Sequence, residues 1–377
     1  ISTDGNNISP RVGFAWSPLA SRKTVIRGGF GFFYDRVPLR ALANALLAAN
    51  NSTDPAQLSQ ISVSLSPSQA GAPVFPLRLT SLTLPPGVLF NFTTMQRNLQ
   101  NAYSIAGNFD IEQQLGRNTS IEAGYEHVRG LHLIASINQN VPTCVASGGN
   151  NGCRSDPAYG NNSQYSSLAD SHYDGLHLSF VQRPASWGNY RVSYTFSKAL
   201  DNVGEFFFSA PLNNFNIWQD YGRSDDDQRH RVVFDGSIRS SQQAADTIWK
   251  KLSHDFELSA LLQYYSALPL NLTTGSTTVQ GTAARPTMGG VFVGRNVGTG
   301  ADFMNLSARL SRSFQITDRL RLQAIAEGFN LTNHVNATSL NGVFGTGAYP
   351  VNPAPNFRQI TAVSDPRAFQ FALRFGF

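Results

Sequence analysis

The sequence predicts an all-β fold, an antiparallel barrel whose long strands cross a membrane. Three features favour this fold class. The composition is poor in charge and rich in glycine and phenylalanine. Apolar and polar residues alternate along segments of about ten residues or more, which is the period of a strand with one apolar face. The connections between these segments alternate between short and long.

The composition sets the first limits. Of the 377 residues, 41% are hydrophobic and only 14% are charged, whereas about 25% are charged in soluble globular domains. The net charge is +5 without a block dense in Lys and Arg, so no nucleic-acid partner is expected. No stretch approaches the roughly 18 apolar residues of a membrane helix, and residues 39–49 are expected to form a short amphipathic helix inside a loop. A membrane crossing would therefore use strands.

The C-terminal segment FQFALRFGF illustrates the alternation. Its apolar residues fall on one side and are expected to face lipid: Phe369, Phe371, Leu373, Phe375 and Phe377. The residues on the other side are expected to face the lumen: Gln370, Ala372, Arg374 and Gly376. A tilted strand of about 9 to 11 residues crosses a bilayer. The pattern predicts eleven such strands, near 9–18, 24–35, 102–115, 118–130, 172–183, 189–198, 229–240, 254–265, 303–314, 319–331 and 367–377.

The connections between these strands alternate in length. The short ones lie near 18–23, 116–118, 184–188, 241–253 and 315–318, and the long ones near 36–101, 131–171, 199–228, 266–302 and 332–366. Short periplasmic turns and long extracellular loops are typical of outer-membrane barrels, which in single bacterial chains have an even number of strands. An odd count predicts that residues 1–377 are the C-terminal part of a larger barrel, with unpaired edges at the first and last strands.

Eight motifs occur in an order that resembles the TonB-dependent outer-membrane receptors of the Oar-like group, whose members often carry an N-terminal carboxypeptidase-regulatory-like domain. They are SPRVGFAWSP (9–18), KTVIRGGFGFFYDR (23–36), IEAGYEHVRGLHL (121–133), HYDGLHLSFVQR (172–183), YRVSYTFSKALDN (190–202), SDDDQRHRVVFDG (224–236), NLSARLSRSFQITDRLRLQAIAEGFNLTNH (305–334) and DPRAFQFALRFGF (365–377). The resemblance implies a barrel of about 22 strands around a plug. The plug, its energy-coupling box and the N-terminal strands would lie upstream of this chain.

The resemblance also implies a function, a location and partners. The function is active uptake of a bulky nutrient across the bacterial outer membrane, driven by the TonB energy-coupling complex acting on the plug. The other partners are outer-membrane lipid, the barrel assembly machinery and a nutrient ligand that the sequence does not identify. The alternating C-terminal residues with the terminal Phe377 resemble the signature by which the assembly machinery recognises barrels.

Two local clusters suggest specific chemistry. Cys144 and Cys153 flank a Gly/Asn/Ser-rich stretch in a long loop, and in an exported protein they are expected to form a disulfide. Asp225, Asp226 and Asp227 are adjacent, whereas calcium loops need spaced oxygen ligands and a turn glycine. This acidic run is therefore expected to pair with nearby arginines where a loop enters a strand. No motif for a catalytic site, a metal or a cofactor is found, so no enzyme activity is expected.

Aromatic residues gather at predicted strand ends, where barrels carry aromatic girdles at the two membrane interfaces. The residues assigned to these girdles are Phe32, Phe33, Tyr34, Trp187, Tyr190, Tyr264 and Tyr265. Residues 206–208, three consecutive phenylalanines in a loop, fit either a girdle or a surface on which a ligand stacks.

Two alternatives to active transport follow from the same sequence. One is a passive outer-membrane channel or adhesion barrel with the same architecture but no energy coupling. The other is a secreted β-sandwich, which would bury the apolar strand faces and expose the polar ones.

Overall fold

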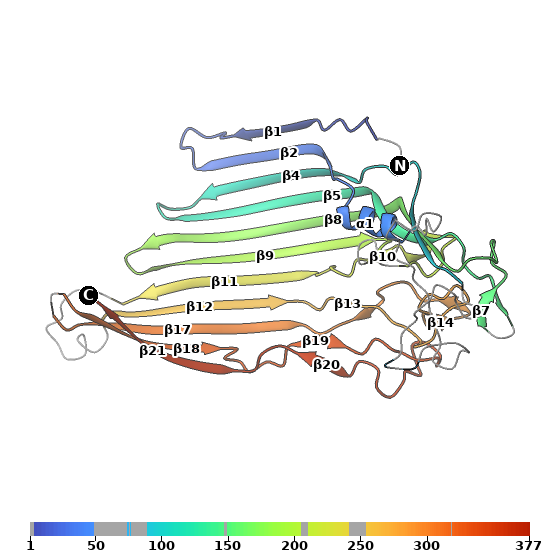
Figure 1. Ribbon diagram of the computed structural model, residues 1–377. Helices are drawn as coiled ribbons and strands as arrows, with labels where there is room; N and C mark the ends of the chain where they lie inside the picture. Colours follow the sequence, from blue (N-terminus) through green and yellow to red (C-terminus); the bar gives the residue numbers. More distant parts are fainter. Residues whose placement is uncertain are drawn as a thin grey trace.

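The computed structural model describes residues 4–48, 74, 76, 89–146, 149–204, 210–240, 254–317 and 319–377. Eleven strands follow one another in a single antiparallel sheet (Figure 1). They are β1 (Arg11–Trp16), β2 (Thr24–Tyr34), β4 (Tyr103–Gln114), β5 (Thr119–Asn138), β8 (Asn162–Ala185), β9 (Gly188–Asp201), β11 (His230–Arg239), β12 (Phe256–Tyr265), β17 (Phe303–Gln315), β18 (Arg321–Phe329) and β21 (Ala368–Gly376). All eleven predicted strands are present, and the all-β antiparallel fold class is confirmed.

The register places apolar residues of neighbouring strands opposite one another on one face of the sheet. Phe234 of β11 lies opposite Val192 of β9 and Leu262 of β12, whereas the next residue back, Val233, lies between Ser193 and Gln263. Because successive side chains of a strand point to opposite faces, the sequence alternation gives the sheet one apolar face and one polar face.

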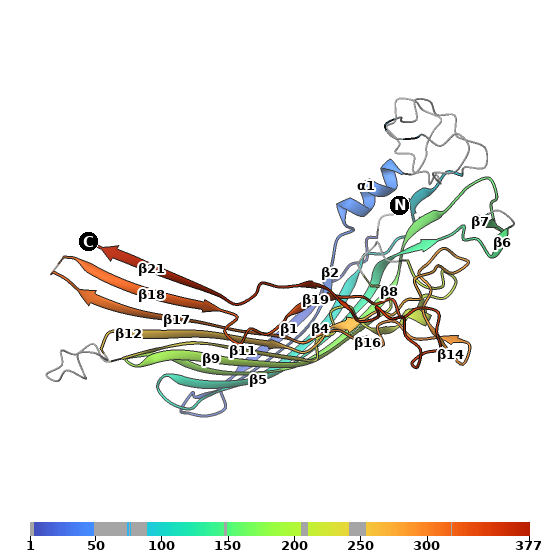
Figure 2. The ribbon, with the colours of Figure 1, turned by 90° about the horizontal axis from the view of Figure 1, so that it is seen from below.

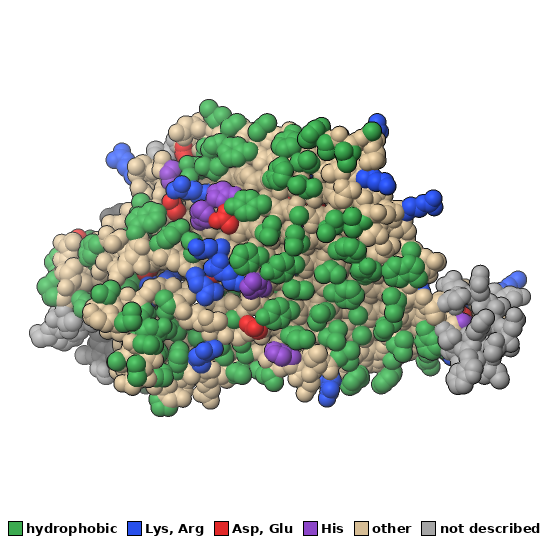
Figure 3. All heavy atoms as spheres, turned by 180° about the vertical axis from the view of Figure 1, so that it is seen from behind, with side chains coloured by type: hydrophobic (Ala, Val, Ile, Leu, Met, Phe, Trp, Pro, Cys, Tyr) green, Lys and Arg blue, Asp and Glu red, His purple; other side chains and the backbone are tan. Residues whose placement is uncertain are grey.

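The apolar face lies on the molecular surface. Viewed from behind, hydrophobic side chains spread over the whole sheet (Figure 3). Among them, Phe14 is 55%, Phe109 46% and Leu310 44% exposed. Soluble monomers rarely expose an apolar patch of more than a few hundred Å². The secreted sandwich, which would bury this face, is therefore excluded.

Aromatic residues at adjacent positions of one strand lie on opposite faces of the sheet. Tyr34 stacks on Tyr103 at 5.1 Å on the apolar face. Phe33, the next residue, faces the other way and lies under the Arg11 guanidinium, 4.3 Å from the ring centroid. Likewise Tyr265 lies on the polar face, opposite to Tyr264. The girdle assignment is therefore wrong for Phe33 and Tyr265, because adjacent residues of one strand cannot both face lipid.

The sheet is open among the described residues. β1 pairs only with β2, and β21 pairs only with β18. Figures 1 and 2 show the sheet curving from β1 to β21 without the two meeting. The predicted unpaired edges are therefore confirmed for the residues that the structure describes.

β5 and β8 continue well beyond their predicted ends at residues 130 and 172. They remain paired past an irregularity between Gly130 and Leu133, and their extensions reach Asn138 and Asn162. The alternation stops there because both sides of this extension are covered: Ile134, Ala135 and Ile137 are all buried. The long connection expected over 131–171 is therefore largely a projecting hairpin.

The remaining elements are short and lie mostly in the long connections. They are α1 (Leu39–Leu47), β3 (Phe92–Met95), β6 (Cys144–Ala146), β7 (Gly149–Gly152), the 3-10 helix η2 (Ile217–Asp220), β10 (Gly222–Arg223), β13 (Pro269–Leu270), β14 (Thr287–Met288), β15 (Val291–Phe292), β16 (Gly298–Thr299), β19 (Ala337–Leu340) and β20 (Ile360–Val363). α1 is the short helix predicted over 39–49. None of the described helices has the length and apolar character needed to span a bilayer.

The long connections gather at one end of the sheet, which we call the loop end (Figure 1). The packed core also lies here. Ala41 and Ala45 of α1 contact Leu99, Ile134 and Tyr165, all less than a tenth exposed. A second cluster joins Ala135, Ile137 and Ala169 to Ile217 of η2. The two faces of the sheet meet different environments, so the sheet does not enclose a packed core. The buried clusters at the loop end instead hold the loops in place.

Candidate functional site

The loop end is held together by buried ion pairs. Asp227 has no solvent exposure, and its Oδ2 lies 2.7 Å from Arg223 Nε and 3.1 Å from Arg229 Nη2. Its Oδ1 accepts a hydrogen bond of 2.8 Å from the backbone N–H of Ala199. The expected pairing of the acidic run with nearby arginines is thus found for Asp227, which fastens the end of β9 to the start of β11.

A second ion-pair group joins two different loops. Arg295, 7% exposed, reaches from the β12–β17 connection to the carboxylate of Asp201 at the end of β9. Its Nη1 lies 3.6 Å from Asp225 Oδ2. Arg285 Nη2 lies 2.8 Å from Asp220 Oδ1, with both side chains almost fully buried. Burial lowers the pKa of Arg295 to about 10, which leaves the guanidinium charged at neutral pH.

These side chains border a cavity of about 130 Å³. Its lining includes Asn202, Asp220, Asp225, Arg285 and Arg295. Nη1 of Arg285 and Nη1 of Arg295 are both buried and have no hydrogen-bond acceptor within the described part of the chain. Buried donors of this kind usually bond to water or to a ligand. The cavity therefore offers donors and acceptors to a small polar group.

A larger groove of about 490 Å³ lies at the polar face of the loop end. Tyr265 and Phe303 line it, and their rings stack with centroids 5.3 Å apart. The Arg231 guanidinium lies 4.8 Å from the centroid of the Tyr265 ring. Asp225 lines both the groove and the smaller cavity, so the two hollows are neighbours. Together they suit a ligand that presents hydroxyl groups and an apolar face.

The alternation of β12 puts Tyr265 on the polar face, a signal that the girdle interpretation overlooked. No sequence signal identified Arg285 or Arg295, because their partners lie about 65 to 95 residues away and in a different loop.

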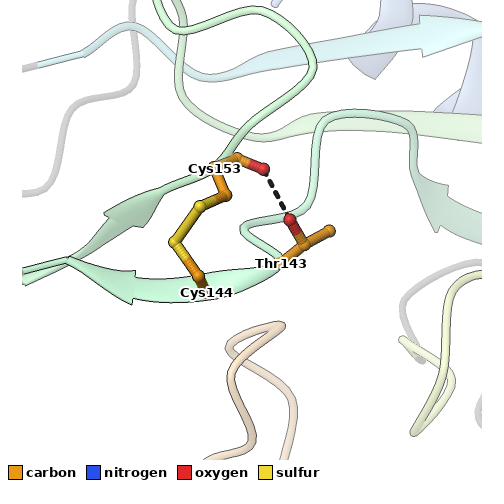
Figure 4. The surroundings of a disulfide bond; sticks show 3 residues. All are labelled: Thr143, Cys144 and Cys153. Atoms are coloured by element: carbon orange, nitrogen blue, oxygen red, sulfur yellow. Dashed lines mark hydrogen bonds between the residues drawn. A yellow bond between two sulfur atoms is a disulfide. The ribbon is translucent and has the colours of Figure 1, made fainter.

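The predicted cysteine pair lies elsewhere, at the tip of the projecting hairpin. Cys144 and Cys153 form a disulfide with their Cα atoms 5.4 Å apart (Figure 4). The Thr143 hydroxyl donates a hydrogen bond of 2.7 Å to the Cys153 carbonyl oxygen. The disulfide closes the base of the two-stranded β6–β7 ribbon. Residues 206–208, assigned either to a girdle or to ligand stacking, lie outside the described residues.

Four of the C-terminal residues expected to form an assembly signal lie on the edge strand β21, and Phe377 follows it. Phe369, Phe371, Leu373 and Phe375 are between 56% and 79% exposed, and Phe377 is fully exposed. They lie on the apolar face and contribute nothing to the hollows at the loop end.

Two groups of histidine and carboxylate side chains occur among the described residues, neither of which the sequence pattern had indicated. On the apolar face, His127 and His172 lie 2.8 Å from the two oxygens of Asp174. On the polar face, His177 meets Asp110 and Glu122. The acidic run 225–227 belongs to neither group.

Comparison with known proteins identifies the family. A family model described as an outer membrane beta barrel domain matches residues 1–291 and 283–370. The chain belongs to this family. It is therefore a protein of the bacterial outer membrane, its apolar face meets lipid, and its polar face lines the lumen. A search of curated proteins found no match.

Solved structures of outer-membrane transporters and receptors share the fold. The transporter YddB from Escherichia coli has 14% sequence identity and a TM-score of 0.58, and the match covers 98% of this chain and 40% of that protein. A mutant of the ferric enterobactin receptor PfeA from Pseudomonas aeruginosa has 14% identity, a TM-score of 0.52, and coverages of 99% and 40%. The FrpB iron transporter from Neisseria meningitidis has 10% identity, a TM-score of 0.50, and coverages of 97% and 39%. The chain thus spans about 40% of the length of YddB and of PfeA.

Proposed function

We propose that residues 1–377 are the C-terminal part of the barrel of a TonB-dependent outer-membrane transporter of the Oar-like group, which takes up a bulky nutrient. The observation that carries the proposal is the open sheet of eleven strands, in a chain that aligns over 98% of its length with two-fifths of a transporter. Two free edges fit a barrel whose other strands are supplied from outside residues 1–377. The plug and its coupling box would also come from outside these residues.

The loop end supports a role in binding. Ion pairs between loops hold the smaller cavity, and Asp225 of these pairs also lines the groove beside Tyr265 and Phe303. A site held in this way reduces the entropy that a ligand must overcome. The groove opens at the polar face, toward the lumen through which a substrate would pass. The similar structures are transporters and receptors, and we propose that this chain likewise binds and conveys its ligand without chemical change.

Uptake in cells tests energy coupling. Three strains are compared by mass-spectrometric analysis of compounds removed from a complex medium: the parent, one without this protein, and one without the inner-membrane energy-coupling protein. We expect at least one compound that only the parent removes. Removal that needs this protein but persists without the coupling protein would instead establish the passive channel. Recovery of the full-length protein in a soluble fraction without detergent would contradict both.

The terminal residue provides a test of assembly. Phe377 is fully exposed, so replacing it with serine removes no packing within the described sheet. If the assembly machinery reads this residue, Phe377→Ser should still lower the amount of folded protein in the outer membrane several-fold. The matched control is Gln370→Ser, on the lumen side of the same strand. Equal amounts of folded protein for both variants would refute the assignment.

A further inference from the structure

The lumen wall carries a group of three potential ligand side chains from three adjacent strands. Asp110 comes from β4, Glu122 from β5 and His177 from β8. His177 Nε2 lies 3.1 Å from Asp110 Oδ1 and 4.0 Å from Glu122 Oε1. The three ligand atoms all lie within 4.8 Å of one another. One imidazole nitrogen therefore faces two carboxylates at a distance that a small cation can bridge.

A glycine makes this convergence possible. Gly124 of β5 lies directly between Asp110 and His177 in the register of the sheet. A Cβ at this position would come within 2.1 Å of Asp110 Oδ1 and 2.2 Å of His177 Nε2. The two side chains therefore extend over the glycine from opposite sides and meet above it. Any other residue would hold them apart.

The surroundings orient Asp110 in the same way. Asn108 Nδ2 donates a hydrogen bond of 2.6 Å to Asp110 Oδ2, the oxygen that does not face His177. Asn108 itself lies over a second glycine, since a Cβ at Gly29 would come within 2.8 Å of Asn108 Oδ1. Hydrogen bonds to the far side of a ligating carboxylate are a regular feature of metal sites. Asp110 is thus fixed with its other oxygen directed toward His177.

The local charge favours a cation. Glu112 and Glu126 share the lumen side of β4 and β5 with Asp110 and Glu122, as the register shows. The nearby positive charge is Arg27, whose Nη2 lies 3.0 Å from Glu112 Oε2. Among the ion pairs of the described residues, Arg27 is the one arginine paired with any of these four carboxylates.

We propose that Asp110, Glu122 and His177 bind a divalent first-row transition metal, with Zn²⁺ the best fit. Zn²⁺ accepts imidazole nitrogen and carboxylate oxygen at about 2.0 to 2.2 Å, and three protein ligands leave a fourth position for water or another group. Mg²⁺ and Ca²⁺ prefer oxygen ligands alone and a larger number of them, which this group does not provide. Bound metal would join β4, β5 and β8 at the lumen surface.

The test uses the full-length protein in detergent, stripped of metal and titrated with Co²⁺, whose visible spectrum reports nitrogen and oxygen coordination. The background carries His127→Ala, which disables the histidine group on the lipid side. We expect one equivalent of Co²⁺ to bind and to be displaced by Zn²⁺ but not by Mg²⁺ or Ca²⁺. His177→Ala should abolish binding.

Gly124→Ala provides the sharper test, because it removes no ligand but occupies the space in which the side chains meet. It should weaken binding by about tenfold or more. Gly107→Ala is the matched control, since a Cβ there meets nothing closer than 3.5 Å. Resistance of each variant to unfolding in SDS without heating shows that the barrel is intact. Binding that survives His177→Ala, or that is equal in Gly124→Ala and Gly107→Ala, would overturn the proposal.

Discussion

Replacing Asp227 with alanine is expected to loosen the loop end by about 3 kcal/mol, the lower part of the range for removing one partner of a buried ion pair. We take the lower part of this range because Arg223 and Arg229 are 27% and 31% exposed. Water can therefore solvate part of the charge that each arginine no longer shares with a carboxylate. The substitution also leaves the backbone N–H of Ala199 without its acceptor. The end of β9 and the start of β11 should then separate more readily.

Limited proteolysis measures this effect, because cleavage of a transiently open loop follows the population of the open form. Asp227→Ala should be cut in the β9–β11 connection at least about a hundredfold faster, which corresponds to the expected free-energy loss. Asp226→Ala is the control: this neighbour is exposed, and its carboxylate takes part in none of the ion pairs of the described residues. Similar cleavage of the two variants would show that Asp227 does not hold the loops. Any ligand bound in the groove should also bind Asp227→Ala more weakly.

The strands were predictable because a barrel wall is a local structure. Each strand must place lipid-facing and lumen-facing residues alternately, so its position appears in a window of about ten residues. The same rule separates Phe33 from Tyr34 and Tyr265 from Tyr264, which the girdle assignment had placed together. The extensions of β5 and β8 escaped prediction because both their faces are covered and the alternation is lost.

The candidate site was largely not predictable because it depends on pairings across strands and loops. Arg295 contacts Asp201 from a loop that follows two further strands in the chain. The sequence around either residue carries no pattern that predicts this pairing. The metal group requires the register of three strands: a shift of one residue in β5 would replace Gly124 with a side chain that blocks it. Asp227 was the exception, because both of its arginines lie within four residues.

A positive charge on the apolar face should prevent stable insertion in the membrane, whereas the same charge one residue away should be tolerated. Phe234 lies near the middle of β11 on the apolar face, between Val192 and Leu262. Arginine at the bilayer midplane of a barrel costs about 2 to 4 kcal/mol. Phe234→Arg also loses the packing of its ring against Tyr190, 6.4 Å away. Val233→Arg instead points into the lumen between Ser193 and Gln263, where water solvates the charge.

Urea unfolding of the full-length protein in lipid vesicles compares the two variants. Phe234→Arg should lower the free energy of unfolding by at least about 2 kcal/mol, and Val233→Arg by much less. The pair shares one strand, one substitution and adjacent positions, so differences in strand propensity and in overall charge cancel. The difference between the two variants therefore reports which face meets lipid, together with the ring packing that Phe234 loses against Tyr190. Equal losses for the two variants, or a larger loss for Val233→Arg, would mean that the apolar face of the sheet does not contact the bilayer.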